Sequence, residues 1–215
     1  AGSVNLSGSA LSFEGWIKPS SFKSASPYIS SIMGTEVSDS NSAFLRLGDA
    51  SLANNKLQFV VSINNVQQKL ASATALNANT WYHVAATYSK SLAEVKFYVN
   101  GLPQETRTAL TPPTINGNQP FRIGSWAGDA ARQFIGDIDE VRIWSVARTP
   151  AEILANYQCE PIQQSGLEIL YHFNQGTAGS ENAGVTTLND DSGNGINGTL
   201  TNFALTGTSS NWIEP

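Results

Sequence analysis

Hydrophobic and polar residues alternate along much of this 215-residue chain, so its side chains repeat with a period of two. Leu57, Phe59, Val61 and Ile63 fall on one face of the segment 56–63. Such alternation is typical of half-buried β-strands, and turn residues separate many of these segments. Further strands are expected at 11–18, 28–33, 43–47, 66–70, 81–88, 95–99, 121–124, 138–144 and 167–173. This pattern predicts an all-β fold, a two-sheet antiparallel jelly-roll sandwich.

Turn and helix signals interrupt the alternation at a few places. Asn64-Asn65 and Asn100-Gly101 are expected to form hairpin turns, because these residues tolerate the left-handed backbone of tight turns. Thr149 and Glu152 have the spacing of a capping box, with Pro150 at the first helical position. This predicts one short helix near 149–158. The segment 174–198 lacks strong alternation and is expected to be a long ordered loop or a linker.

Composition and charge exclude several classes of function. The chain has 12 Lys+Arg and 17 Asp+Glu, a net charge of −5, and no basic run that would favour nucleic acid or an anionic membrane surface. No uninterrupted apolar stretch approaches the length of a bilayer span, so membrane insertion is not expected. Cys159 is the only cysteine, which excludes an internal disulfide.

The start of the chain and its composition favour a processed extracellular protein. The sequence begins at Ala1, without Met and without a secretory leader, so we interpret it as a piece of a longer chain with neighbouring domains as partners. The polar, uncharged and turn-rich composition suits a secreted or cell-surface location.

No arrangement of residues predicts catalysis, and no catalytic residue is proposed. Asp137 and Asp139 have the phase of a carboxylate pair on one strand, but no acid follows at position 141 to complete a glycosidase set. His83 and His172 lie within strands, and no G-x-S-x-G nucleophile sequence is present. Both are expected to be hydrogen-bonded or half-exposed sheet residues.

Asp139 is the first candidate for a metal site. It is in phase with Val141 and Ile143, so its carboxylate is expected to point toward the interior and to need a partner there. A structural calcium ion is one solution, with oxygen ligands from Asp191 and Asn194 in the following Asn/Asp-rich loop. The alternative is that Asp139 accepts hydrogen bonds from backbone N–H groups and that Asp191 is a solvated turn residue.

Trp126 is the first candidate for ligand binding. It lies between two strands in a glycine-flanked loop, with Asp129 and Arg132 nearby, and an aromatic face with planar polar groups suits a sugar. The alternative is that Trp126 anchors the loop on the core. Trp16 is a further candidate, because it shares a face with Glu14, either on an outer sheet face or under a covering loop.

Four segments resemble motifs of bacterial laminin G-like domains in the concanavalin A-like superfamily. Residues 11–19, 81–88, 95–101 and 134–149 are similar, in order, to FTISAWVKP, W-x-H-V-A-x-T-Y, lYvNG and F-x-G-x-I-D-E-V-R-I-W followed by A-R-T. The resemblance implies a jelly roll that binds glycans or proteins, often with a structural calcium, and is usually noncatalytic. Catalytic relatives carry an E-x-D-x-x-E strand, which this sequence lacks.

Two later segments are similar to family segments that normally come first. They are 166–173 and 191–200, and here they follow the other motifs. A circular permutation would explain this, with one domain over 1–215 and residues 160–215 supplying its C-terminal strands. Alternatively, the last part of the chain begins a following repeat. We favour one closed domain, since Leu167 and Ile169 would otherwise lack a core.

These observations favour a noncatalytic extracellular module that recognises a polysaccharide or a glycosylated partner and is stabilised by calcium. A structural or adhesive spacer in a large surface protein is the alternative. A polysaccharide-degrading enzyme is a third and weaker interpretation, because the carboxylate trio is missing.

Overall fold

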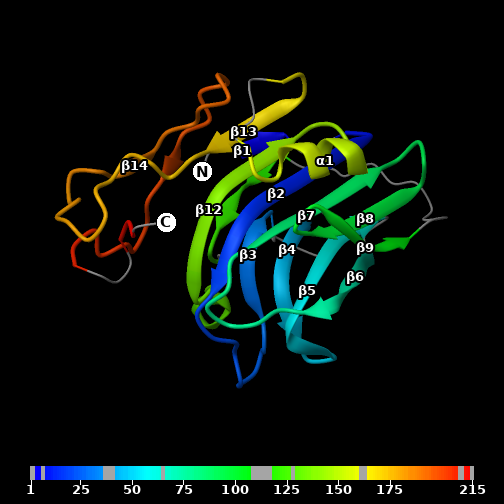
Figure 1. Ribbon diagram of the computed structural model, residues 1–215, viewed down its shortest axis with the longest axis horizontal. Helices are drawn as coiled ribbons and strands as arrows, with labels where there is room; N and C mark the ends of the chain where they lie inside the picture. Colours follow the sequence, from blue (N-terminus) through cyan, green and yellow to red (C-terminus); the bar gives the residue numbers. More distant parts are fainter. Residues whose placement is uncertain are drawn as a thin grey trace.

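A computed structural model describes residues 3–5, 8–35, 42–63, 66–107, 118–126, 129–159, 164–207 and 211–213. Within these residues the chain folds into two packed antiparallel sheets with one short α-helix (Figure 1). The predicted all-β sandwich is therefore confirmed. The hairpin turn expected at 64–65 lies outside the described residues.

The two layers contain five and six strands. The five-stranded sheet has the order β11-β3-β4-β5-β6, and the six-stranded sheet the order β13-β12-β2-β7-β8-β9. The strands of the first are β3 (Ser30–Gly34), β4 (Ala43–Asp49), β5 (Leu52–Ile63), β6 (Val66–Ala75) and β11 (Arg122–Ile123). Those of the second are β2 (Ala10–Pro19), β7 (Tyr82–Ser89), β8 (Glu94–Val99), β9 (Leu102–Arg107), β12 (Gly136–Trp144) and β13 (Leu167–Tyr171). Two short pairs complete the described strands: β1 (Ser3–Asn5) with β10 (Asn118–Pro120), and β14 (Thr187–Leu188) with β15 (Gly198–Thr199).

The register of the strands directs alternate side chains into the space between the sheets. Phe13 of β2 lies opposite Ala86 of β7 and Ile143 of β12, and all three are buried. Phe59 of the five-stranded sheet meets Phe13 edge to face, with ring centroids 6.1 Å apart. Each such side chain contributes about 1.5–3 kcal/mol on burial, so this shared core holds the two layers together.

The predicted helix is confirmed as α1 (Pro150–Asn156), and it covers the outer face of the six-stranded sheet (Figure 1). Thr149 accepts a hydrogen bond from the Glu152 backbone N–H, while the Glu152 carboxylate accepts one from the Thr149 N–H. Ile153 is buried against Ala85 and Tyr98 of the sheet. α1 therefore shields part of the outer face of this sheet from solvent.

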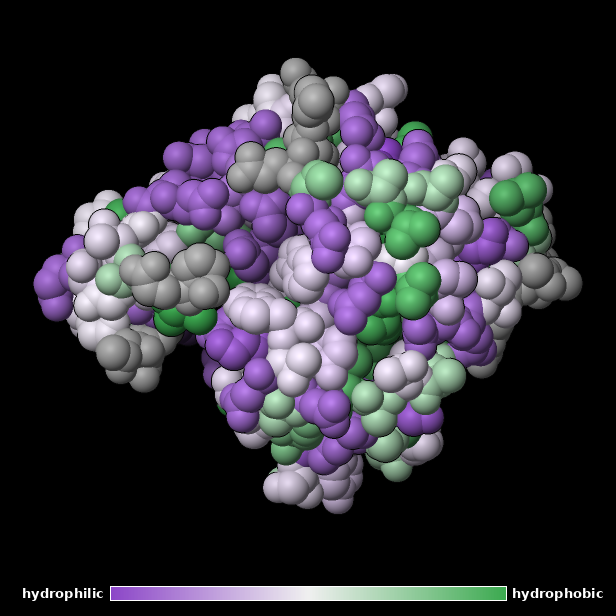
Figure 2. All heavy atoms as spheres, in the orientation of Figure 1, coloured by the Kyte–Doolittle hydropathy of each residue, from purple (hydrophilic) through white to green (hydrophobic). Residues whose placement is uncertain are grey.

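The solvent side of this region is partly apolar. Leu154 of α1 is 52% exposed and Leu102 of β9 is 58% exposed. In Figure 2 the surface is largely hydrophilic, with a few hydrophobic groups in the part of the view where α1 and β9 lie in Figure 1.

β13 joins the six-stranded sheet at its β12 edge. Ile169 lies opposite Ile143 and Tyr171 opposite Val141, and these side chains are buried in the core. After β13 the chain forms irregular turns and the β14–β15 pair, which lie beside the sandwich in Figure 1. The Trp212 indole N–H donates a hydrogen bond to the Phe173 carbonyl. A single domain over 1–215 stays a prediction.

A buried ionic network occupies the outer face of the five-stranded sheet. One carboxylate oxygen of Asp49 lies 3.2 Å from Arg46 Nη2 and 3.1 Å from Gln58 Nε2, while the other accepts hydrogen bonds from Ser51. Burial alone would raise the pKa of Asp49, but the hydrogen bonds from Ser51 and Gln58 and the charge of Lys69 together hold that pKa well below its usual range.

Asp49→Asn is expected to lower the free energy of unfolding by about 2 kcal/mol at pH 7, because it removes charge-assisted hydrogen bonds. A depressed carboxyl pKa stabilises the fold above the unfolded-state pKa of about 3.9, and this contribution is lost as the pH falls. The difference between the two proteins should therefore shrink by about 1 kcal/mol between pH 6 and pH 3. Urea unfolding at several pH values measures it, and a constant difference would contradict the assigned network.

Candidate functional site

The loop with Trp126 is anchored beside the five-stranded sheet. Its base is closed by hydrogen bonds from the Gly124 N–H to the Ile32 carbonyl and from the Phe134 N–H to the Gly124 carbonyl, each 2.8 Å long. A backbone bridge between Ser31 and Gln133 fixes its returning end against β3. Gly124 has a φ of +73°, which favours glycine at this sharp exit from β11.

Three predicted ligand-binding residues come together on this loop. The Arg132 guanidinium carbon lies 4.0 Å from the centre of the Trp126 ring, and Arg132 Nε lies 3.7 Å from Asp129 Oδ2. Asp129 also begins a short 3-10 helix (Ala130–Arg132), because its Oδ1 accepts a hydrogen bond from the Ala131 N–H at 2.8 Å. The Asp129 cap thus positions its own ion-pair partner next to the indole.

These three side chains combine apolar and polar groups on a partly exposed surface. The Arg132 side chain is 20% exposed and that of Asp129 35% exposed, and Trp126 is also half-buried. An indole offers a flat apolar face, a guanidinium only donors, and a carboxylate only acceptors. This is the combination that orients a ligand with both C–H and O–H surfaces.

Trp16 lies on the other sheet. Its indole N–H donates a 3.0 Å hydrogen bond to the Tyr157 carbonyl, and its ring stacks on Tyr157 with centroids 6.2 Å apart. The His83 ring approaches it edge-on at 5.7 Å. The structure therefore places Trp16 beneath the segment that follows α1, the covered position that the sequence left open, and its contacts are not with the Trp126 loop. Its role in ligand binding stays a prediction.

Asp139 does not point toward the core, so that prediction is wrong. Asp139 pairs with Trp16 and Arg142 pairs with Glu14, which leaves three steps on β12 against two on β2. This β-bulge, with Glu140 at a φ of +50°, reverses the phase of the strand. Asp139 consequently shares the outer face with Trp16, where burial raises its pKa and its Oδ1 accepts a hydrogen bond from the Glu140 N–H.

The other predicted calcium ligands stabilise a turn beside β13. Asn194 Nδ2 donates hydrogen bonds to the carbonyls of Leu167 at 2.9 Å and Glu168 at 3.1 Å, and the Asp191 N–H donates one to Leu170. Both Asp191 and Asn194 are exposed. Across the described part of the chain, no group of three or more His, Cys, Asp or Glu side chains could hold a metal ion. Calcium stays a prediction and enters no step below.

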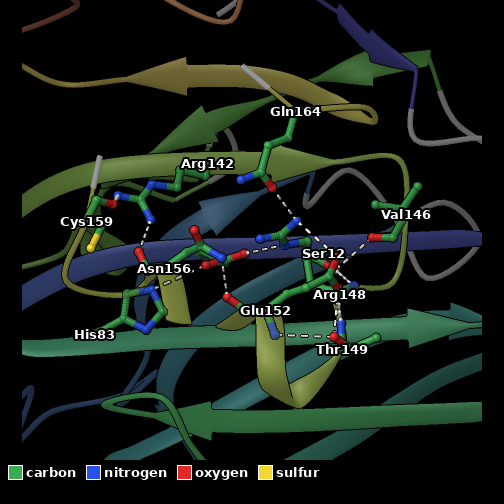
Figure 3. A network of polar contacts seen from close by, with 11 residues as sticks. Ser12, His83, Arg142, Val146, Arg148, Thr149, Glu152, Asn156, Cys159 and Gln164 are labelled. Atoms are coloured by element: carbon green, nitrogen blue, oxygen red, sulfur yellow. Dashed lines mark hydrogen bonds and ion pairs between the residues drawn. The ribbon is translucent and has the colours of Figure 1, made fainter. Parts of the chain in front are cut away.

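The polar groups under α1 form a second cluster (Figure 3). Glu14 and His83 are each 1% exposed, with Glu14 Oε2 3.5 Å from His83 Nε2 and Glu14 Oε1 3.7 Å from Arg148 Nε. Arg148 also lies 4.1 Å from the Trp144 ring centre and donates a 2.8 Å hydrogen bond to Gln164. His83 is therefore buried, and neither it nor Glu14 has a side-chain hydrogen bond within the described residues.

His172 belongs to a third polar group, at the β12 bulge. Its Nδ1 lies 2.6 Å from Glu140 Oε1, and Glu140 Oε2 lies 3.1 Å from Arg142 Nη2. Arg142 in turn donates hydrogen bonds to the carbonyls of Asn156 and Cys159. The prediction of a hydrogen-bonded His172 is thus correct. The only sequence signal for these contacts was the D-E-V-R motif. The alternation of hydrophobic and polar residues did not predict the β-bulge that β12 forms at this motif.

Comparison with known proteins assigns the family. The sequence model of the concanavalin A-like lectin/glucanases superfamily, in its laminin G-like form, matches residues 1–154. The chain belongs to this superfamily. The resemblance of the four strand motifs is therefore confirmed.

Two solved structures and one sequence relative are similar to this chain over part of their length. A Bacteroides ovatus protein whose proposed role is carbohydrate binding is 28% identical with a TM-score of 0.71, over 89% of this chain and 51% of that one. The CBM40 domain of a Ruminococcus gnavus sialidase, solved with sialyllactose, is 16% identical with a TM-score of 0.57, over 70% and 83%. Mouse serum amyloid P-component is 28% identical over 86 residues, 37% of this chain and 38% of the relative.

The chain thus spans about half of the Bacteroides protein and less of serum amyloid P-component. Among the helices described, none has the length and hydropathy needed to cross a membrane.

Proposed function

We propose that this protein is a noncatalytic module that binds a polysaccharide or the glycan of a glycoprotein at the Trp126 loop. The observation that carries the proposal is the contact of Arg132 with the Trp126 ring, held by the capping carboxylate of Asp129. Because Arg132 covers one face of the indole, the opposite face or the edge would pack on the C–H face of a sugar ring, while Asp129 and Arg132 would hydrogen-bond to hydroxyl groups of the glycan beside it. Family membership and the 28% identical Bacteroides protein support a carbohydrate ligand.

Binding would depend on side chains that are held in position before the ligand arrives. Hydrogen bonds at the base of the loop and the Asp129 cap fix these side chains before a ligand arrives, which reduces the entropy lost on binding. A secreted or cell-surface location and stabilisation by calcium belong to the same proposal. Melting in calcium and in EGTA would test the ion separately from the sugar.

Trp126→Ala is expected to weaken glycan binding about 30-fold, the equivalent of about 2 kcal/mol for a central aromatic contact. Affinity electrophoresis through gels with a panel of soluble polysaccharides measures the change. Trp81→Ala is the matched control, because Trp81 also carries a cation, Lys18 Nζ at 5.6 Å, but lies at the other sheet. Equal retardation of the Trp126 variant and the wild type would remove the loop from the binding site. No retardation by any polysaccharide would favour a structural spacer.

A further inference from the structure

The two charged residues of the Trp126 site, Asp129 and Arg132, form an ion pair whose opposite charges cancel. Arg132 Nε lies 3.7 Å from Asp129 Oδ2, and the two side chains are only 20% and 35% exposed. Partial burial strengthens the interaction of each charge with its neighbour, because less water screens it. An incoming ligand therefore meets one positive and one negative group at close range, with no net charge between them.

We infer that this site selects uncharged glycans over acidic ones, an inference that rests on the proposed function. A uronate or sulfate placed against Arg132 would also lie close to the Asp129 carboxylate, and like charges at such a distance repel. The charge of the whole chain, −5, adds a weaker repulsion in the same direction. An acidic sugar would thus gain one attraction and suffer one repulsion.

A neutral sugar can use both groups without that conflict. A hydroxyl group is both donor and acceptor, so one hydroxyl can donate to Asp129 while its neighbour accepts from Arg132. Hydrogen bonds to ionised partners are stronger than those between neutral groups. Arg132 lies over one face of the Trp126 ring at 4.0 Å, so the C–H face of a sugar would pack on the opposite face or the edge of the indole. All three side chains then contribute to binding.

The test compares matched neutral and acidic polymers. Wild-type protein is run in low-salt affinity gels with hydroxyethylcellulose against carboxymethylcellulose and with dextran against carboxymethyl-dextran. We expect retardation by at least one neutral polymer and an affinity at least about tenfold lower for its acidic partner, equivalent to about 1.4 kcal/mol. Added salt should narrow the difference, because it screens the repulsion.

Asp129→Asn isolates the charge from the shape of the site. Asparagine keeps an oxygen for the Ala131 N–H cap but removes the negative charge beside Arg132, so the neutral-to-acidic preference should fall about tenfold. Asp129→Ser removes the charge with a different capping group and should act in the same direction. Asp137→Asn is the matched control: it removes an equal charge from a pair with Lys18 (3.4 Å) and should leave the preference unchanged.

The outcomes separate the inference from the proposed function. Wild-type binding to acidic polymers that equals or exceeds binding to neutral ones would overturn the selectivity while leaving glycan binding intact. If Asp129→Asn kept the neutral-to-acidic preference of the wild type, the inference would be overturned as well. The same holds if Asp129→Asn and Asp137→Asn lowered that preference by the same factor. Failure of every polymer to retard the wild type would overturn the proposed function, and the inference with it.

Discussion

A chain that ends at Cys159 is expected to lose most of the stability of the full chain. The truncation removes β13, whose Leu167, Ile169, Leu170 and Tyr171 side chains are buried to 6% exposure or less. At about 1.5–3 kcal/mol for each buried side chain, the loss is about 6–12 kcal/mol. A domain is typically stable by only about 5–15 kcal/mol, so the shortened chain should be largely unfolded at 25 °C.

Urea unfolding followed by far-UV circular dichroism measures this effect. A chain that ends at residue 207 is the control, because it keeps β13 and the β14–β15 pair and removes only the last segment with Trp212. That control should stay cooperatively folded. A chain ending at Cys159 with the stability of the full protein would contradict the prediction, and would favour a C-terminal segment that begins a following repeat.

The sequence was sufficient for most of the sandwich, because a strand with one buried face must alternate. β2, β4 and β5 were all predicted from alternation, and the helix followed from its capping box. β9 was missed, since LPQETR is polar and lies at a sheet edge, where it buries little. The clustering of Trp126, Asp129 and Arg132 was predictable because these residues share one short loop.

The errors come from features that one strand's pattern does not contain. A single extra residue at the β12 bulge reversed the phase between Asp139 and Val141, and alternation alone gave no sign of the insertion. His83 was expected to be hydrogen-bonded or half-exposed because it lies in the middle of a strand, yet it is buried and its ring nitrogens have no hydrogen-bond partner among the described residues. The path of the chain after β12 decides which element covers the outer face of the six-stranded sheet, and here α1 crosses that face and buries it. The residues around His83 alone do not predict that a segment distant in sequence covers them.

The largest single-residue effect is expected at the buried ion pair under α1. Arg148→Met should lower the free energy of unfolding by about 3–5 kcal/mol, because it removes the cation that faces the buried Glu14 carboxyl group. The side chain of methionine roughly replaces the apolar stem of arginine against Trp144, so packing there is kept, while the hydrogen bond to Gln164 is lost together with the charge. Chemical unfolding at pH 7 measures it.

A double-mutant cycle separates this pair from general damage. Glu14→Gln alone removes the buried acid beside Arg148 but leaves the Arg148 contacts with Glu152 at 3.5 Å and Gln164 at 2.8 Å, so it should cost less than Arg148→Met. Glu14→Gln with Arg148→Met removes both charges and should cost less than the sum of the single changes. Lys18→Met and Asp137→Asn provide the matched surface cycle: that pair is 3.4 Å apart but 32% and 28% exposed, so its coupling should be about 1 kcal/mol or less. If the losses in the free energy of unfolding for Glu14→Gln and Arg148→Met simply added in the double mutant, the two residues would not be coupled and the prediction would be contradicted.

The same cluster should contain ordered water. The Glu14 oxygens and His83 ring nitrogens have no hydrogen-bond partner among the described residues, and their ionic contacts of 3.5 and 3.7 Å are longer than direct hydrogen bonds. Buried polar atoms in folded proteins are nearly always satisfied, and a water molecule bridging several of them is the usual solution. A water-bridged pair still interacts electrostatically, because both side chains are buried away from bulk water. The coupling between Glu14 and Arg148 is therefore expected to exceed that of the shorter but exposed Lys18–Asp137 pair, since burial outweighs distance here.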